Sequence, residues 1–152
     1  MKENTRLSEH FTLREFIVSG IAIRHGIVNN PTEADIRRMR LLCERVLEPL
    51  RRRFGVLRIT SGFCCTELNK KVGRDGNSPH LTGEAADIHI SDPEVAWKMV
   101  TFLQVQGIEF DQCLLEELVK ENVRWLHISY REGENRQQIK HIRLERRKEG
   151  KD

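Results

Sequence analysis

Apolar residues between positions 33 and 53 follow the spacing of an amphipathic helix. They recur every three or four positions and so share one helical face: Ile36, Met39, Leu42, Val46 and Leu50. Thr32 and Asp35 stand where the start of a helix is capped. Pro49 predicts a bend near the end, because proline cannot continue the helical hydrogen bonding.

A shorter helix is expected before the long one. In FTLREFIVS (residues 11–19), Glu15 follows Thr12 by three positions, which is the spacing of a capping box. The stretch AIRHGIVNNP (22–31) is rich in turn residues and predicts a loop between the two helices. Residues 1–9 are expected to form a flexible lead-in.

The pattern changes to strands after residue 55. Alternation and β-branched residues predict strands in VLRIT (56–60), AADIHI (85–90), FDQCLLEE (110–117), RWLHISY (124–130) and QIKHIRLE (138–145). Two helices interrupt them, one in TELNKKVG closed by Gly73 and one from Asp92 to about Gln106. This order predicts an α+β domain, with a mostly antiparallel sheet and the N-terminal helices packed on one side.

The composition is that of a single globular domain. Hydrophobic residues make up 38% of the 152 positions and charged residues 32%, which is ordinary for a water-soluble chain that buries a core. No apolar run approaches the ~18 residues of a membrane helix. The N-terminus lacks the apolar stretch of a secretory signal, so we expect a cytoplasmic protein, or one whose export signal has been removed.

The formal net charge of +3 arises in the C-terminal tail. From Arg131 onward eight Lys and Arg oppose five Asp and Glu, whereas the preceding residues balance. A solvated basic tail explains this most simply, and contact with an anionic polymer such as cell wall is the alternative. No basic stripe is interleaved with aromatic residues, so neither nucleic acid nor membrane is expected as a partner.

The four cysteines are expected to be reduced and to bind no metal. They are Cys43, Cys64, Cys65 and Cys113, and no pair has the C-x-x-C spacing of a redox or zinc motif. They are typical of small buried hydrophobes. Cys64 follows a predicted strand, and we expect it to line the cleft that holds the candidate metal-binding residues described next.

The segment SPHLTGEAADIHI (78–90) carries the candidate chemistry. His80 and Asp87 are residue types that bind zinc, and a catalytic zinc site has three protein ligands with one position left open. Gly83 permits a turn between them and the two alanines permit close packing, so Asp87 can return to the same metal. The third ligand has to come from elsewhere in the fold.

Among the other histidines, His127 is the best candidate for the third ligand. In RWLHISY, strand alternation puts Trp125, His127 and Ser129 on one face, where the backbone holds a ligand rigidly. A strand histidine that only forms hydrogen bonds is the alternative. His89 shares a face with Asp87 and remains a competing ligand. The remaining histidines have no carboxylate at a ligand spacing: His10, His25 and His141.

Hydrolysis at a metal also needs a base that takes a proton from water. Glu116, at the end of FDQCLLE, leaves its strand just before the connection to His127. It can therefore sit beside the metal without binding it. Glu117 and Glu121 are the rival candidates.

Two motifs together resemble a known peptidase family. They are S-x-H-x-x-G-x-A-x-D, formed by Ser78, His80, Gly83, Ala85 and Asp87, and W-x-H-x-S, formed by Trp125, His127 and Ser129. With FTLREF, ITSGF, LNKKVG and FDQ, they resemble the zinc D-alanyl-D-alanine carboxypeptidase family over about residues 10–130. That family includes phage L-alanyl-D-glutamate endopeptidases and shares its fold with the hedgehog signalling domain.

The resemblance implies one Zn²⁺ per chain, with three protein ligands: His80, Asp87 and His127. It also supports Glu116 as the base, because the hedgehog branch has a glutamate in the matching F-D-x-x-x-x-E stretch. Ser78 and Ser129 would orient the ligands through hydrogen bonds, and Trp125 would wall the cleft.

Two positions depart from the family's pattern. Some members carry an acidic residue three positions before the last histidine, where this chain has Arg124, which leaves Glu116 as the base. Relatives often read S-G-x-R after the early strand, and the arginine is thought to face substrate. Cys64 stands at that position here, and Arg24 or Arg74 would have to replace the arginine.

The sequence thus predicts a zinc peptidase domain over residues 10–130, and a last strand and basic tail over 131–152. It would act as a monomer on peptidoglycan stem peptides, as a D,D-carboxypeptidase or an L,D-type endopeptidase, such as a phage lysis enzyme released to the cell wall. Two alternatives stay open: a non-catalytic zinc domain that binds a wall fragment or a protein partner, and an interaction module without metal.

Overall fold

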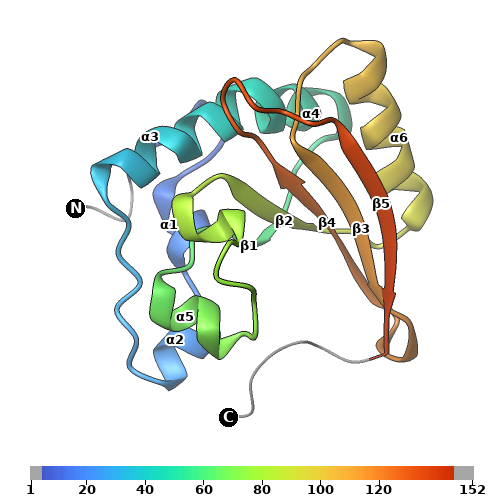
Figure 1. Cartoon of the computed structure of the whole chain (residues 1–152). Coiled ribbons are helices and arrows are strands. Elements are labelled where there is room, and N and C mark those ends of the chain that lie inside the picture. Colours follow the sequence, from blue (N-terminus) through green and yellow to red (C-terminus); the bar gives the residue numbers. More distant parts are fainter. Residues whose placement is uncertain (1–4, 146–152) are drawn as a thin grey trace.

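The computed structural model describes residues 5–145 (Figure 1). Its α-helices are α1 (Leu13–Ile17), α2 (Gly20–Arg24), α3 (Glu33–Leu42), α4 (Glu48–Phe54), α5 (Thr66–Lys71) and α6 (Pro93–Val105). Shorter helical turns are η1 (Cys43–Leu47), η2 (Pro79–Thr82) and η3 (Val119–Glu121). The strands are β1 (Ile59–Ser61), β2 (Ala85–His89), β3 (Gln112–Leu118), β4 (Val123–Ser129) and β5 (Gln138–Leu144). The α+β class predicted from the sequence is therefore confirmed.

The five strands form one sheet in the order β1-β2-β4-β3-β5. The expectation of a mostly antiparallel sheet was wrong, because β5 pairs in parallel with β3 and makes the sheet mixed. Both edges of β4 are already taken by β2 and β3. Strand β5 runs back from β4 along the free edge of β3, and because β3 and β4 are antiparallel it meets β3 in the parallel direction.

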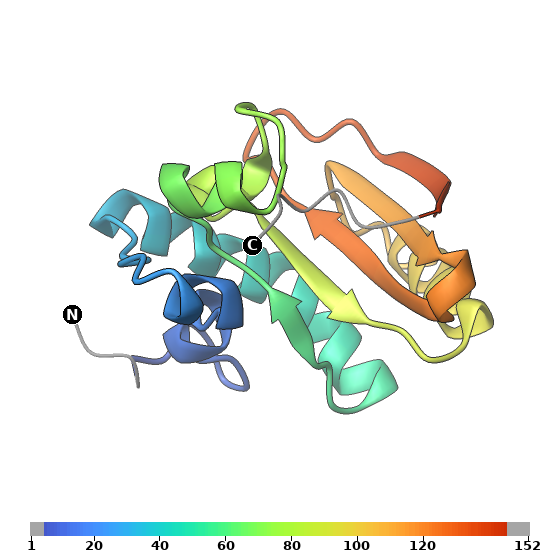
Figure 2. The same ribbon diagram turned by 90° about the horizontal axis from the view of Figure 1, so that it is seen from below.

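One face of the sheet packs on the helical layer and forms the core. Figures 1 and 2 show α3, α4 and α6 on this side. The strand residues that point toward the helices are buried and apolar: Ala86, Ile88, Cys113, Leu115, Leu126 and Ile128. Since side chains alternate along a strand, the intervening residues lie on the opposite face. That face carries Asp87 and His127.

The long helix predicted over residues 33–53 is present but interrupted by a π-helical turn. Helices α3 and α4 are joined by η1, in which the N–H of Glu48 donates to the carbonyl of Cys43 five residues earlier. Pro49 lies in the first turn of α4. Because proline has no N–H and crowds the preceding turn, the wider turn accommodates it. The irregularity thus lies just before the proline.

The N-terminal region is more ordered than the sequence indicates. Helix α2, which Ser19 caps by accepting from the N–H of Ala22, ends at Arg24 and takes up the first three residues of the predicted loop at residues 22–31. In the described part of the lead-in, Leu7 is 2% exposed and the hydroxyl of Ser8 donates to Glu48 over 2.6 Å. The basic end of the tail, residues 146–152, lies outside the described residues. Within residues 5–145, no helix has the length and apolarity that a membrane span requires.

Candidate metal centre

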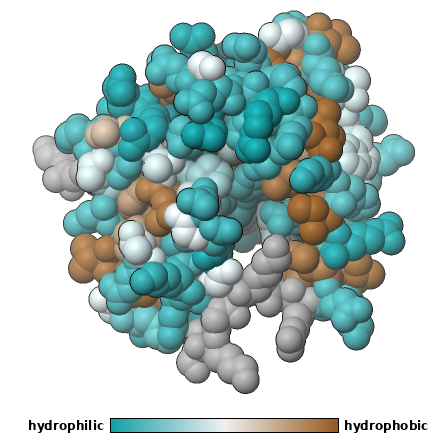
Figure 3. All heavy atoms as spheres, in the orientation of Figure 1, coloured by the Kyte–Doolittle hydropathy of each residue, from teal (hydrophilic) through white to brown (hydrophobic). Residues whose placement is uncertain are grey.

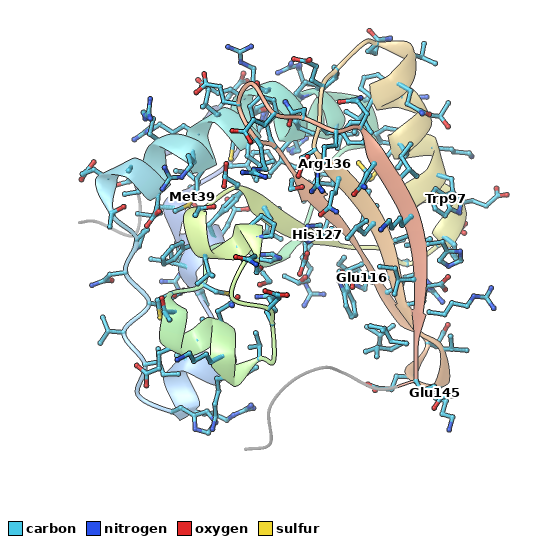
Figure 4. The ribbon with its side chains drawn as sticks, in the orientation of Figure 1. Met39, Trp97, Glu116, His127, Arg136 and Glu145 are labelled. Carbon is cyan, nitrogen blue, oxygen red and sulfur yellow. The ribbon has the colours of Figure 1, made fainter. Side chains whose placement is uncertain are left out.

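Three buried side chains meet on the open face of the sheet. Oδ1 of Asp87 lies 3.3 Å from Nε2 of His80 and 3.0 Å from Nδ1 of His127. One donor atom from each residue lies within 4.8 Å of the other two. Among residues 5–145 this is the one cluster of three or more His, Cys, Asp or Glu with such spacing. Figure 4 shows His127 and Glu116 on the strands that bound the site.

Strand pairing positions Asp87 and His127. They lie directly opposite each other in the antiparallel β2–β4 pair, so both point to the same face. Each is 6% exposed. The rigidity that the sequence predicted for a ligand on a strand therefore applies to both residues.

His80 is held by the turn η2 and by a backbone carbonyl. Its N–H donates to the hydroxyl of Ser78 over 3.2 Å, and its Nδ1 lies 2.6 Å from the carbonyl oxygen of Gly62. A carbonyl oxygen only accepts, so Nδ1 carries the proton and Nε2 keeps its lone pair. That lone pair faces Asp87. The hydroxyl of Ser78 thus holds the backbone of His80 rather than its imidazole ring.

Two glycines allow the chain to approach closely around His80. Gly83 ends η2 with φ +78°, and a Cβ there would lie 2.6 Å from the carbonyl oxygen of Asp35. A Cβ on Gly62 would lie 2.7 Å from the backbone of Phe16. Gly83 thus makes the turn that the sequence predicted, and Gly62 brings its carbonyl within reach of the imidazole.

Arg74 contacts the same carboxylate from the side. Its Nη2 donates to Oδ2 of Asp87 over 3.2 Å and to the hydroxyl of Ser61 over 3.1 Å, while Nη1 donates to Sγ of Cys64 over 2.9 Å. The guanidinium group therefore fills the space beside Cys64. Arg74 is one of the two residues that we expected from the sequence to replace the arginine of the family's S-G-x-R pattern, where this chain has Cys64.

The electrostatics of the cluster favour a neutral imidazole and an ionised carboxylate. Burial lowers the pKa of His80. Burial would raise the pKa of the Asp87 carboxyl, but the two neighbouring histidine side chains outweigh burial and hold that pKa well below its usual range. These are the protonation states in which the two groups bind a metal.

The donor set fits a zinc ion. Two imidazoles and one carboxylate are ligands that zinc accepts, and three protein ligands are typical of catalytic sites that keep one position open. The proton on Nδ1 of His80 leaves the other ring nitrogen available, as a ligand needs. The cluster borders a cleft of about 970 Å³, so a fourth position is accessible.

Glu116 lies in that cleft together with the three residues. In the β3–β4 pair it stands opposite Trp125, whose indole N–H donates to its Oε1 over 2.9 Å. Trp125 is two residues from His127 on the same face of the sheet. The Trp125 hydrogen bond therefore holds the carboxylate of Glu116 on the cleft face of the sheet, and Glu116 is not part of the three-residue cluster.

The rival bases lie elsewhere. Glu117 points to the opposite face, where it pairs with Arg124 over 3.0 Å and contacts His141. Glu121 is exposed in η3. His89, the competing ligand, is also exposed, and its Nε2 lies 3.4 Å from the hydroxyl of Ser91.

The remaining candidates divide between the cleft and the sheet. Ser78, Trp125, Arg24 and Cys64 all line the cleft. Ser129 is fully buried, and its hydroxyl accepts from the N–H of Gln112, so it joins β3 to β4. All four cysteines are free. In the orientation of Figure 3 the surface is mainly hydrophilic, with hydrophobic residues in separate groups.

Comparison with known proteins gives one family. A family model described as peptidase M15 matches residues 9–129, which is well over half of the chain. The match spans the three clustered residues and Glu116. No curated protein sequence matched the chain.

Proposed function

The chain belongs to the peptidase M15 family, and on that premise we propose that it is a zinc metallopeptidase that hydrolyses peptidoglycan stem peptides. The observation that carries the proposal is the convergence of His80, Asp87 and His127 within 4.8 Å at the edge of an open cleft. The resemblance of the two motifs to wall peptidases supports the choice of substrate.

His80, Asp87 and His127 would hold the zinc ion. When bound, zinc supplies Lewis acidity, which polarises a peptide carbonyl and makes water a nucleophile near neutral pH. Asp87 contributes a negative charge that offsets part of the charge of the ion. The Gly62 carbonyl fixes the tautomer and the ring orientation of His80.

Glu116 would serve as the general base. It would take the proton that water loses when it attacks the scissile carbonyl, and it would deliver that proton to the leaving amine. The hydrogen bond from Trp125 keeps the carboxylate on the cleft side of the sheet. The face of the indole ring would form part of the wall against which the peptide lies.

The site is compatible with either of two cleavages in the bacterial wall, by a D,D-carboxypeptidase or by an L,D-type endopeptidase. We propose the cell wall as the place of action. A non-catalytic zinc domain that binds a wall fragment is the second candidate, and Cys64 at the position of the family's substrate-facing arginine favours it.

The test is incubation of the full chain with purified peptidoglycan and with a pentapeptide ending in D-Ala-D-Ala. Products are identified by mass, before and after removal of metal by chelator and after return of zinc. We expect cleavage that chelator abolishes and zinc restores. Zinc binding without cleavage of either substrate would favour the binding domain, and absence of zinc binding would contradict both.

A further inference from the structure

The two oxygens of Asp87 have different neighbours. Oδ1 lies 3.0 Å from His127 and 3.3 Å from His80, so it is the oxygen at the centre of the cluster. Oδ2 accepts from Nη2 of Arg74 over 3.2 Å. A free carboxylate turns readily about its terminal bond and can offer either oxygen or both. Here the two oxygens are distinguished by an arginine.

Arg74 is itself fixed at both ends. Its N–H donates to the carbonyl of Asn69 over 3.0 Å, and the side-chain amide of the buried Asn69 donates to the carbonyl of Asp75 over 2.9 Å. The guanidinium group is held by Ser61 and Cys64 besides Asp87. Only 24% of its side chain is exposed. The group is thus oriented before any ligand arrives.

We propose that Arg74 is a positioning residue that holds Oδ2 of Asp87 and presents only Oδ1 to the metal. The inference rests on the proposed zinc site and adds a determinant of its coordination. The planar fork of an arginine can contact three partners at once, whereas a lysine ammonium is a flexible point charge. Positioning therefore depends on the shape of the group as well as on its charge.

Charge and positioning predict opposite effects on zinc binding. A guanidinium group beside a dication repels it, so charge alone predicts that its removal tightens zinc binding. If Arg74 orients Asp87, its removal weakens zinc binding, because groups that orient metal ligands typically contribute about 10- to 100-fold in affinity. The sign of the change therefore separates the two effects.

The experiment measures zinc affinity of the full chain by competition with a chelator, for Arg74→Ala and Arg74→Lys. We expect both variants to bind zinc about 10- to 100-fold more weakly than the parent. Arg37→Ala, which removes an exposed arginine from α3, should leave the affinity unchanged. The absorption bands of bound Co²⁺ report the coordination number, and Arg74→Ala should shift them as Oδ2 becomes available.

Unchanged or tighter zinc binding in Arg74→Ala, with the Co²⁺ bands of the parent, would overturn the inference. If the parent protein bound neither Zn²⁺ nor Co²⁺, both the inference about Arg74 and the proposed function would be overturned. Failure of the inference alone is therefore distinguishable from failure of the proposed function. Ser61→Ala covers the case in which Arg74→Ala does not fold. It removes one partner of the guanidinium group and should weaken zinc binding less, but in the same direction. An affinity equal to that of the parent would count against positioning.

Discussion

The indole N–H of Trp125 donates to Oε1 of Glu116 over 2.9 Å, across a strand pair in which the two residues lie directly opposite each other. The aromatic residue therefore does more than wall the cleft. It ties the proposed base to β4, two residues from the proposed ligand His127. A change at Trp125 should affect the proton transfer without affecting the metal.

Trp125→Phe keeps an aromatic wall and removes the N–H. Hydrogen bonds to charged groups contribute about 1.5–3 kcal/mol, so we expect kcat for stem-peptide hydrolysis to fall roughly 10- to 100-fold, with zinc affinity unchanged. Trp97→Phe is the control, since Trp97 belongs to α6 on the far side of the sheet (Figure 4). A parent-like rate for Trp125→Phe would show that Glu116 needs no such support.

Glu116→Gln preserves the shape of the side chain and removes its basicity. Loss of a general base typically costs about 100- to 10,000-fold in rate, and we expect that loss with zinc still bound. The adjacent Glu117→Gln is a matched control, because Glu117 points to the opposite face and pairs with Arg124. Steady-state hydrolysis and elemental analysis check both variants. If Glu116→Gln cleaved as fast as the parent, the base would be another residue.

Zinc should stabilise the folded protein, because a ligand that binds only the native state raises its stability. At a free concentration 100 times the Kd this amounts to about 2.7 kcal/mol. We expect zinc to raise the melting temperature of the parent and of His89→Ala, but not that of His127→Ala. Thermal unfolding with and without zinc checks this without any turnover. An equal shift in His127→Ala would exclude His127 as a ligand.

Gly62→Ala should destabilise the protein, because its Cβ would lie 2.7 Å from backbone atoms of Phe16. Insertion of an atom into a packed region typically costs about 1–3 kcal/mol. Gly20→Ala is the control, because a Cβ there meets nothing within 4 Å. Denaturant unfolding gives both values. A free energy of unfolding equal to that of the parent would mean that α1 can move away without cost.

Asp111 should make stability depend on pH. Hydrogen bonds from Arg136 hold the pKa of its buried carboxyl below the usual value, so its contribution is complete above the unfolded pKa of about 3.9. That contribution is lost as pH falls through the lower pKa of the folded state. Asp111→Asn should therefore be less stable than the parent at pH 7, with a deficit that shrinks in acid.

Thermal unfolding at several pH values checks the prediction for Asp111. Glu132→Gln, an exposed carboxyl near Arg136 in sequence, should follow the parent at every pH. A deficit for Asp111→Asn that did not change between neutral and acid pH would show that the carboxylate charge contributes nothing to stability.

Local patterns in the sequence predict most of the elements but not their pairing. Helical spacing identified α3, the start signal at Asp92 and Pro93 identified α6, and alternation and β-branched residues identified the strands. Helix α2 was missed because five residues are too few to show a period, and its cap at Ser19 is a weak signal. The parallel direction of β5 depends on which strand edges remain free, and that is a property of the whole sheet.

Predictions about the site follow the same division. His80 and Asp87 lie within one short motif, and His127 lies in a segment with the alternation of a strand. All three candidate ligands could therefore be named from the sequence. The contacts of Arg74 follow from the path of the loop after α5 and from the reach of a long side chain. Neither the loop path nor the reach of the side chain produces a periodic pattern in the sequence, so these contacts could not be predicted from it. The hydrogen bond from Trp125 to Glu116 likewise required the register of β3 against β4.

The two-faced sheet also has a consequence for how this protein can change over evolutionary time. Along β3 and β4, side chains alternate between the two faces of the sheet, so that every second residue packs in the core and the residues between them face the cleft. A substitution at Gln112 or Leu114 alters the surface of the cleft, while the alternate residues Cys113 and Leu115 keep the core packing intact. Substrate preference can therefore drift by single mutations without a compensating change in the interior.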